Sequence, residues 1–170
     1  MIDTEFPRVM ARYNRWMNER LYECCARMPD ADRRRDMGAF FKSIHGTLNH
    51  LLLADRVWMG RFVGPLFAPK SLADELYADF DELRRQRAST DDDIDAWVAT
   101  LSNERLRGEL RYTSIVNPAP RTVGMDLAVT HFFNHQTHHR GQLTTLLMQQ
   151  GIDPGATDLM WVPQPAAVPS

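Results

Sequence analysis

Four long stretches of the chain place apolar residues at the spacing of an α-helix, and this pattern constrains the fold more than any other feature. They run from about 5 to 28, from 37 to 62, from somewhere after Ser71 to 101, and from 125 to 150. An apolar stripe on each helix must be buried against other helices. In a chain of 170 residues, the pattern therefore predicts one all-α domain built as a four-helix bundle.

Turn-forming and capping residues mark where these helices end. Pro29 follows the first helix and Gly64-Pro65 follows the second, and neither can continue a helix easily. Ser71 is a candidate N-cap for the third helix, and Gly151 is a suitable residue just beyond the fourth. The acidic run 90–93 either breaks the third helix or begins a fresh helical stretch, since acidic residues favour a first turn.

Short β-favouring runs separate the third and fourth helices. Residues 111–116 and 121–123 flank the Pro-rich segment 117–120, which predicts a small β-hairpin, although an isolated two-stranded hairpin is marginally stable. At the other end of the chain, residues 163–170 contain three prolines and no charged side chain. We therefore expect a folded domain over 1–162 and a flexible tail over 163–170.

Charge and hydropathy argue against several classes of partner. The net charge is −2, without the basic surface typical of nucleic-acid binding. No run of about 18 apolar residues could span a membrane, and the N-terminus lacks the apolar core of a signal peptide. The two cysteines, Cys24 and Cys25, are adjacent and pair poorly with each other. These features predict a cytoplasmic protein with no nucleic-acid or membrane partner.

All six histidines fall within two of the predicted helices, at His45 and His50 in the second and at His131, His135, His138 and His139 in the fourth. Histidines four residues apart lie one turn apart on one helix face, which is a spacing that lets one helix give two imidazoles to one metal ion. The fourth helix offers this spacing twice, because His135 is four residues from both His131 and His139.

Helical geometry favours one of these two pairs. At 100° per residue, His135 and His139 lie within about 20° of the apolar axis of the helix, whereas His131 and His138 lie roughly 60–80° to one side. That axis is defined by Ala128, Phe132, Leu143 and Leu146. We expect His135 and His139 to face the bundle interior, where polar groups need carboxylates, water or a metal ion as partners.

A third ligand would have to come from another helix. Because imidazole is the commonest protein ligand for zinc-like metals, a further histidine on the second helix favours a metal site. His45 and His50 lie about 140° apart around that helix, so both cannot face one ion. Periodicity does not choose between them. Each lies off the main apolar axis, which indicates a site at the mouth of a pocket.

Asp55 lies on the apolar axis of the second helix, so its carboxylate needs a partner. It could orient a ligand histidine. The favoured alternative is a structural salt bridge to an arginine on a neighbouring helix, such as Arg15 or Arg140.

Four segments resemble the DinB family of damage-inducible proteins. Residues 47–58 (TLNHLLLADRVW) and 131–142 (HFFNHQTHHRGQ) match its two signature segments, and 12–16 and 151–159 are also similar to it. The resemblance implies a four-helix bundle of up-down-down-up order, often dimeric. It also implies a metal site with one histidine from the second helix and two, four apart, from the fourth. Carried onto this sequence, the ligands are His50, His135 and His139.

A site with three protein ligands keeps a position open for a small molecule. The metal is expected to be divalent, with zinc or nickel favoured. Relatives with this fold and triad are thiol-dependent transferases and isomerases, so the resemblance implies a transferase that uses a low-molecular-weight thiol. One alternative is a non-catalytic metal-binding stress-response protein. Another is a metal-dependent hydrolase, although no Glu follows the histidines as in His-Glu-x-x-His; Asp55 or Asp158 could serve if either lies near the ion.

A homodimer is also expected. The first two helices carry more bulky apolar side chains than one core stripe needs, although all of them could instead be core residues. These side chains are Trp16, Met17, Trp58 and Phe62.

Overall fold

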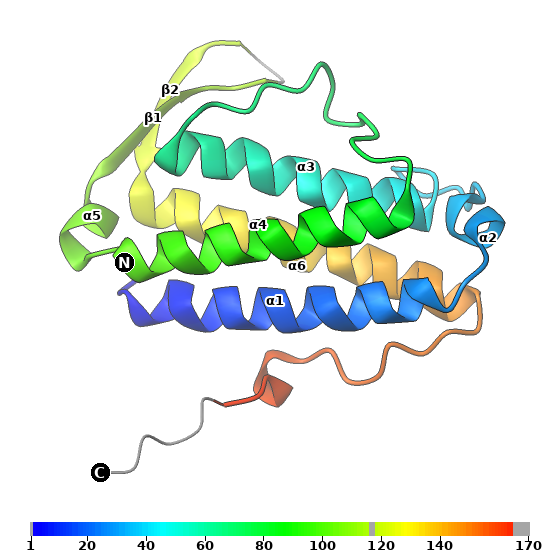
Figure 1. Ribbon diagram of the computed structural model, residues 1–170. Coiled ribbons are helices and arrows are strands. Elements are labelled where there is room, and N and C mark those ends of the chain that lie inside the picture. Colours follow the sequence, from blue (N-terminus) through cyan, green and yellow to red (C-terminus); the bar gives the residue numbers. More distant parts are fainter. Residues whose placement is uncertain (1, 116–117, 165–170) are drawn as a thin grey trace.

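The computed structural model describes residues 2–115 and 118–164 and is dominated by four long helices. Figure 1 shows them side by side as a bundle. They are α1 (Glu5–Ala26), α3 (Ile44–Val63), α4 (Phe80–Thr100) and α6 (Met125–Gln149). The predicted all-α four-helix bundle is confirmed.

The helices run in up-down-down-up order, as the family resemblance implied. In Figure 1, α1 and α6 run in one direction, and α3 and α4 run in the other. Because α3 and α4 are parallel neighbours, the chain must return along the bundle between them. Residues 64–79 make this return as a long loop beside α3.

Short elements close the ends of the bundle. The helices α2 (Asp30–Arg34), α5 (Asn103–Arg107) and η1 (Leu159–Trp161) are one or two turns long. The predicted hairpin is present: β1 (Glu109–Thr113) pairs antiparallel with β2 (Pro120–Gly124). Its support comes from Leu110, which is buried in the bundle core. Residues 116–117 of the predicted hairpin, and all but the first two residues of the predicted tail, lie outside the described residues.

Two predicted helix starts were wrong. α3 begins at Ile44 rather than near 37, because Ser43 caps it by accepting a hydrogen bond from the Gly46 amide on its Oγ. α4 begins at Phe80, capped by Asp79, rather than after Ser71. Residues 37–43 and 71–79 are therefore free to form loops, and both loops contribute to the site described below.

The structure also shows how the chain behaves at the acidic run 90–93 and at Gly151. The acidic run 90–93 neither breaks α4 nor begins a new helix, because α4 is continuous through it. Beyond α6, Gly151 has a φ of +73°. Its amide donates to the Met148 carbonyl and the Ile152 amide donates to the Leu147 carbonyl, which is the Schellman end expected of a glycine here.

The core consists of two hydrophobic clusters with buried polar side chains between them. One cluster includes Met17, Leu52, Leu83 and Leu143, and the other includes Met59, Ile94, Phe132 and Phe133. On α3, α4 and α6 the polar residues fall in sequence between members of the two clusters. This polar layer, drawn from all four helices, consists of Asn14, Asn18, Asp55, Arg87, Asp91, Gln136 and Arg140.

The polar layer corrects the expected partner of Asp55. Its carboxylate lies 2.5 Å from Nη1 of Arg87 and also accepts a hydrogen bond from the Gln136 amide. Arg15 instead pairs with Asp92 and Asp95 on the surface, and Arg140 donates to Asn14. A structural salt bridge was therefore the right expectation for Asp55, but the partner is on α4.

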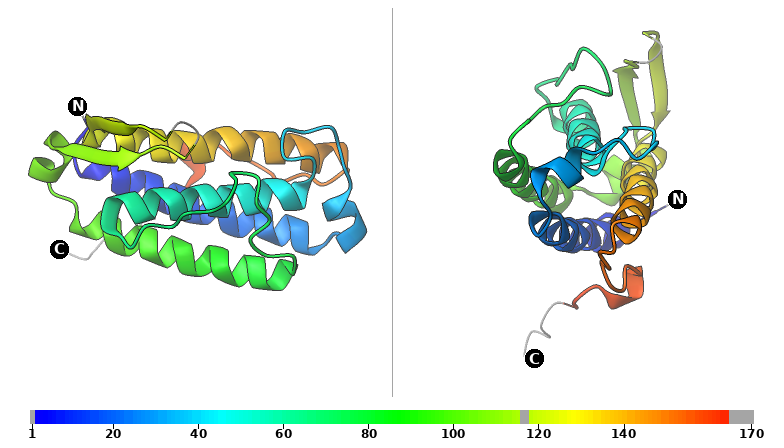
Figure 2. Two further views of the ribbon diagram at one scale, coloured as in Figure 1. Left: turned by 90° about the horizontal axis from the view of Figure 1, so that it is seen from above. Right: turned by 90° about the vertical axis from the view of Figure 1, so that its right-hand side faces the viewer.

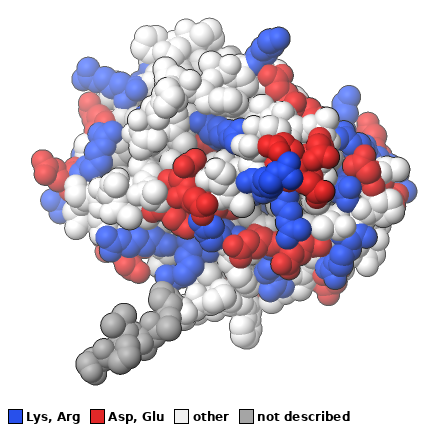
Figure 3. All heavy atoms as spheres, in the orientation of Figure 1, with Lys and Arg blue, Asp and Glu red and all other residues white. Residues whose placement is uncertain are grey.

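The surface and the helix composition bear on the predicted partners. None of the helices in the described ranges is long and apolar enough to cross a membrane. Acidic and basic side chains are interspersed on the face shown in Figure 3. Of the four bulky residues on which a dimer was predicted, Met17 and Phe62 are buried in the core, while Trp16 and Trp58 are partly exposed.

Candidate metal centre

Three histidines converge where α3 lies beside α6. His50 comes from α3, and His135 and His139 come from successive turns of α6. Each offers one ring nitrogen, and these atoms all lie within 4.8 Å of one another. His50 and His139 are buried and His135 is partly exposed. The structure thus brings together the three residues expected from the resemblance, at the edge of the bundle rather than in its centre.

One ring nitrogen of His50 is hydrogen-bonded, and the other has no partner in the described part of the chain. Its Nδ1 lies 2.8 Å from the Leu72 carbonyl oxygen, in the loop that leads to α4. A carbonyl can only accept, so Nδ1 carries the proton and Nε2 presents a lone pair. That Nε2 is buried and has no hydrogen-bond partner among the described residues. A buried polar atom without a partner is costly, and a metal ion would satisfy it.

His139 is oriented in the same way. Its Nδ1 lies 2.8 Å from the Gln142 side-chain oxygen, so its Nε2 faces inward, 3.1 Å from Nε2 of His135. Zinc–nitrogen bonds of 2.0–2.1 Å at tetrahedral angles place two ligand nitrogens about 3.3–3.4 Å apart. The spacing of this pair is close to that value, so His135 and His139 fit two ligands of a zinc-like ion, and the donor nitrogen of His50 lies within 4.8 Å of both.

The imidazoles are in the neutral form that binds metals. Burial lowers the pKa of His50 to about 4, with the neighbouring His139 adding to the effect. Burial and the other histidines lower the pKa of His135 to about 3, and burial lowers the pKa of His139. At neutral pH the cluster therefore carries no charge to repel a cation.

An aromatic residue that the sequence reasoning missed covers the centre. The Phe41 ring stacks on His50 with centroids 3.7 Å apart and meets His139 edge-on at 5.5 Å. A Cβ on Gly46 would lie 2.2 Å from the Phe41 carbonyl oxygen, so glycine is needed for this close approach. Residues 37–43 were predicted as helix, which hid Phe41; Ser43 as a capping residue was the signal that could have revealed the loop.

The other three histidines have different surroundings. His45 is buried, and its Nε2 lies 2.9 Å from the Tyr77 carbonyl oxygen and 3.2 Å from an Arg34 nitrogen. It therefore points away from the centre, which resolves the choice that periodicity left open. His131 packs against Trp58, with ring centroids 5.0 Å apart. His138 is exposed beside His139.

The centre opens into a cavity of about 510 Å³. Its walls are mainly apolar, and no carboxylate belongs to them within the described ranges. Asp55 is enclosed in the polar layer, and Asp158 lies in the segment beyond α6, on the opposite side of the bundle from the loop 64–79. Besides the three histidines, the lining residues are Phe40, Phe41, Ser71, Leu72, Ala73, His138 and Gln142.

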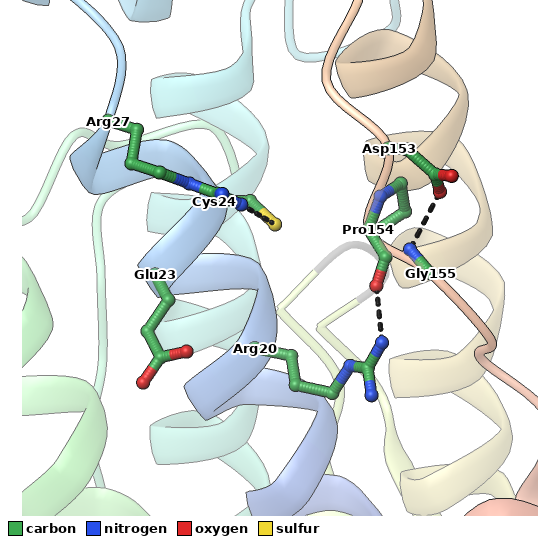
Figure 4. A pocket seen from close by; sticks show the side chains of 7 residues that line it. All are labelled: Arg20, Glu23, Cys24, Arg27, Asp153, Pro154 and Gly155. Atoms are coloured by element: carbon green, nitrogen blue, oxygen red, sulfur yellow. Dashed lines mark hydrogen bonds between the residues drawn. The ribbon is translucent and has the colours of Figure 1, made fainter.

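A separate cavity of about 480 Å³ lies between α1 and the segment after α6 (Figure 4). Its two arginines already have partners there: Arg20 donates to the Pro154 carbonyl, and Arg27 donates to the Cys24 sulfur. Cys24 and Cys25 are free thiols, but both are buried, and burial raises the pKa of Cys25 to about 12. Neither is an accessible nucleophile.

A sequence model of the DinB family matches residues 1–169. The chain belongs to the DinB family. A relative in this family is Protein DinB of Bacillus subtilis (strain 168), which is 26% identical over 165 residues, covering 91% of this chain and 92% of the relative. The resemblance seen in the signature segments is thereby confirmed over nearly the whole length.

A solved structure shares the fold of this DinB-family chain. YfiT from Bacillus subtilis is similar with a TM-score of 0.66 and 14% identity, over 90% of this chain and 92% of that one. YfiT is described as a probable metal-dependent hydrolase with an unusual four-helix bundle topology. At this identity the likeness concerns the arrangement of the helices.

Proposed function

We propose that this protein binds one divalent metal ion, zinc or nickel, through His50, His135 and His139. The observation that carries the proposal is the buried Nε2 of His50, which lacks a partner among the described residues and faces two other neutral imidazoles. Three imidazoles suit these metals, and the Leu72 carbonyl and Gln142 hold the outer nitrogens of His50 and His139.

We further propose that the centre is a metal-dependent transferase that uses a low-molecular-weight thiol. When bound, the ion would lower the pKa of a thiol at its open position, so that the thiolate could attack an electrophile. The chain contributes a mainly apolar wall, in which the Phe41 ring covers His50, and His138 at the rim could accept the thiol proton. Its own cysteines are buried, so the thiol must come from outside.

A metal-dependent hydrolase is the second candidate, supported by the likeness to YfiT, which is described as one. A hydrolase commonly needs a general base near the ion. Asp55 and Asp158 do not line the cavity, so His138 is the side chain positioned for that role.

Metal content tests the first proposal. Purified wild-type protein is expected to hold close to one ion per chain, and His50→Ala, His135→Ala and His139→Ala should each lose most of it. His45→Ala is the matched control, because this histidine lies on α3 but points away from the centre. Full retention of metal by His135→Ala would overturn the ligand assignment.

Cobalt substitution separates the candidate functions. A transferase should show a thiol-dependent change in the visible spectrum at millimolar thiol or below. No change with any small thiol would remove the transferase proposal. Turnover of ester or amide substrates without thiol would favour the hydrolase, and a loaded but inert protein would favour a non-catalytic metal-binding stress-response role.

We also propose a homodimer acting in the cytoplasm. The free Cys24 and Cys25 are compatible with a reducing compartment, and sedimentation velocity tests the dimer directly. A monomer at micromolar concentration would contradict it.

A further inference from the structure

Arg61 packs against two aromatic rings at the far end of α3. Its guanidinium carbon lies 4.5 Å from the ring centroid of Trp58, on the same helix, and 4.5 Å from that of Tyr112, on β1. The two ring centroids are only 5.5 Å apart, so both rings lie toward one side of the guanidinium carbon and leave N–H groups on its other side free. That arrangement suits an in-plane partner with two acceptor oxygens, such as a carboxylate.

Arg61 lacks such a partner in the part of the chain that the structure describes. Of the residues in the described ranges, none forms an ion pair with its guanidinium. Two partly buried arginines that do have such partners are Arg15, which pairs with two aspartates, and Arg34, which pairs with Asp30 and Glu75. Burial lowers the pKa of Arg61, the mark of a charge that is poorly solvated and not compensated.

Arg61 lines a cavity of about 240 Å³ that also reaches the metal centre. Its walls include His50 and His135 at one end and Trp58, Arg61 and Tyr112 at the other. The rings of Trp58, His131 and His135 connect the two ends, with centroid distances of 5.0 and 5.9 Å. A small elongated molecule could therefore touch both the histidines and Arg61.

We propose that Arg61 forms an anion subsite of the metal centre and binds a carboxylate of the molecule whose other end reaches His50 and His135. This inference rests on the proposed function in taking the centre as the reactive end. The subsite would select acidic substrates or acidic thiols over neutral ones. It also gives the hairpin a role, because β1 supplies Tyr112, one of the two rings against which the guanidinium packs.

Arg61 could instead serve only to hold the hairpin against α3. A brace of that kind would make no difference between charged and neutral ligands. The selectivity of binding therefore distinguishes the two roles.

The first experiment measures binding of ω-mercaptoalkanoates, from 3-mercaptopropionate to 11-mercaptoundecanoate, to the cobalt-substituted protein. Each acid is compared with the alcohol of the same length. Because a charge-assisted pair with a partly buried arginine is strong, the acid should bind about tenfold more tightly or better once the chain spans the cavity. Equal affinity of acid and alcohol at every length overturns the inference.

Variants attribute that preference to the guanidinium. Arg61→Gln should bring the acid-to-alcohol ratio close to one, and Arg61→Lys should retain part of it, because lysine keeps the charge but not the fork. Arg111→Gln is the matched control: it removes the same charge beside Tyr112, but its side chain is 82% exposed. Loss of preference in Arg111→Gln to the same extent would also overturn the inference.

A second readout does not depend on the metal. In protein labelled with ¹⁵N-arginine, hexanoate should shift the Arg61 Nε–H resonance, and hexanamide should not. If neither thiol series changes the cobalt spectrum but hexanoate shifts Arg61, the thiol function fails and the subsite stands. If neither series binds and hexanoate has no effect, both fail. These measurements on the wild-type protein distinguish an anion subsite from a structural role of Arg61 even if Arg61→Gln does not fold.

Discussion

Two polar clusters lie within the same bundle, and they differ in whether their side chains form charged pairs with one another. In the polar layer, Asp55 contacts Arg87, Arg87 contacts Asp91 at 2.9 Å, and Asp91 accepts from Asn18 at 3.0 Å. In the metal centre, the outer nitrogens of His50 and His139 are held, but their inner nitrogens face one another. The first cluster contains charged pairs, one of them between helices, although Nε of Arg87, Nε of Arg140 and the Gln136 side-chain oxygen have no partner among the described residues. The second contains no charged pair and places three neutral imidazoles around one point.

The two clusters show two ways in which polar side chains can be buried, as a pair of opposite charges or as neutral groups. In the polar layer, burial raises the pKa of the Asp55 carboxyl while the Arg87 guanidinium opposes that shift, so the ion pair persists only because both partners are present. The histidines avoid the problem by being neutral when buried. A layer of charged pairs holds helices together, whereas a cluster of neutral imidazoles is available to bind an ion.

Asp55→Ala should have the largest effect on stability. It leaves the Arg87 charge buried without this partner, which costs roughly 3–5 kcal/mol of the free energy of unfolding. Urea denaturation of the metal-free protein measures this loss. Asp95→Ala, which removes a surface partner of Arg15, is the control and should cost about 1 kcal/mol or less. Equal losses in the two variants would contradict the contrast between buried and surface pairs.

Gln142→Ala should weaken metal binding without removing a ligand. The side-chain oxygen of Gln142 fixes the orientation of His139, and loss of such a support typically lowers metal affinity about 10–100-fold. A competition titration with a chelating dye measures the change. Gln149→Ala, at the exposed end of the same helix, should leave the affinity unaltered; a change there comparable with Gln142→Ala would refute the assigned role.

His45→Ala should separate a structural histidine from the metal-binding ones. It removes one hydrogen bond to the Tyr77 carbonyl, which still accepts from Asn49, so about 1–2 kcal/mol of stability should be lost. Metal affinity should not change. A drop in metal content parallel to that of His50→Ala would show that the choice between the two histidines is wrong.

Mild acid should destabilise the metal-free protein gradually. In the unfolded chain, histidines gain protons near pH 6.5, whereas in the fold the pKa of His50 is about 4 and that of His135 about 3. The unfolded state therefore binds more protons, and stability falls as the pH drops from about 6.5 toward 4. Denaturation at several pH values should show a shallower slope for the double variant His50→Ala/His135→Ala. An unchanged slope would mean that these side chains do not carry the effect.

Local signals in the sequence determined the four helices, the hairpin and the facing pair His135 and His139. Periodicity, capping and turn chemistry act over a few residues, so they can be read along the chain. The place of Asp55 on a buried face could be predicted for the same reason. The signature segments added the family, its topology and the choice of His50.

Only the tertiary structure decided which groups became partners. Asp55 pairs with Arg87 rather than Arg140 because α4 packs beside α3. His50 faces the centre because the carbonyl of Leu72 is hydrogen-bonded to its outer nitrogen. Phe41 covers His50 because α3 begins only after Ser43, which leaves Phe41 in a loop. Such contacts join residues far apart in the chain. They depend on how helices and loops are placed in space, which no short-range pattern specifies.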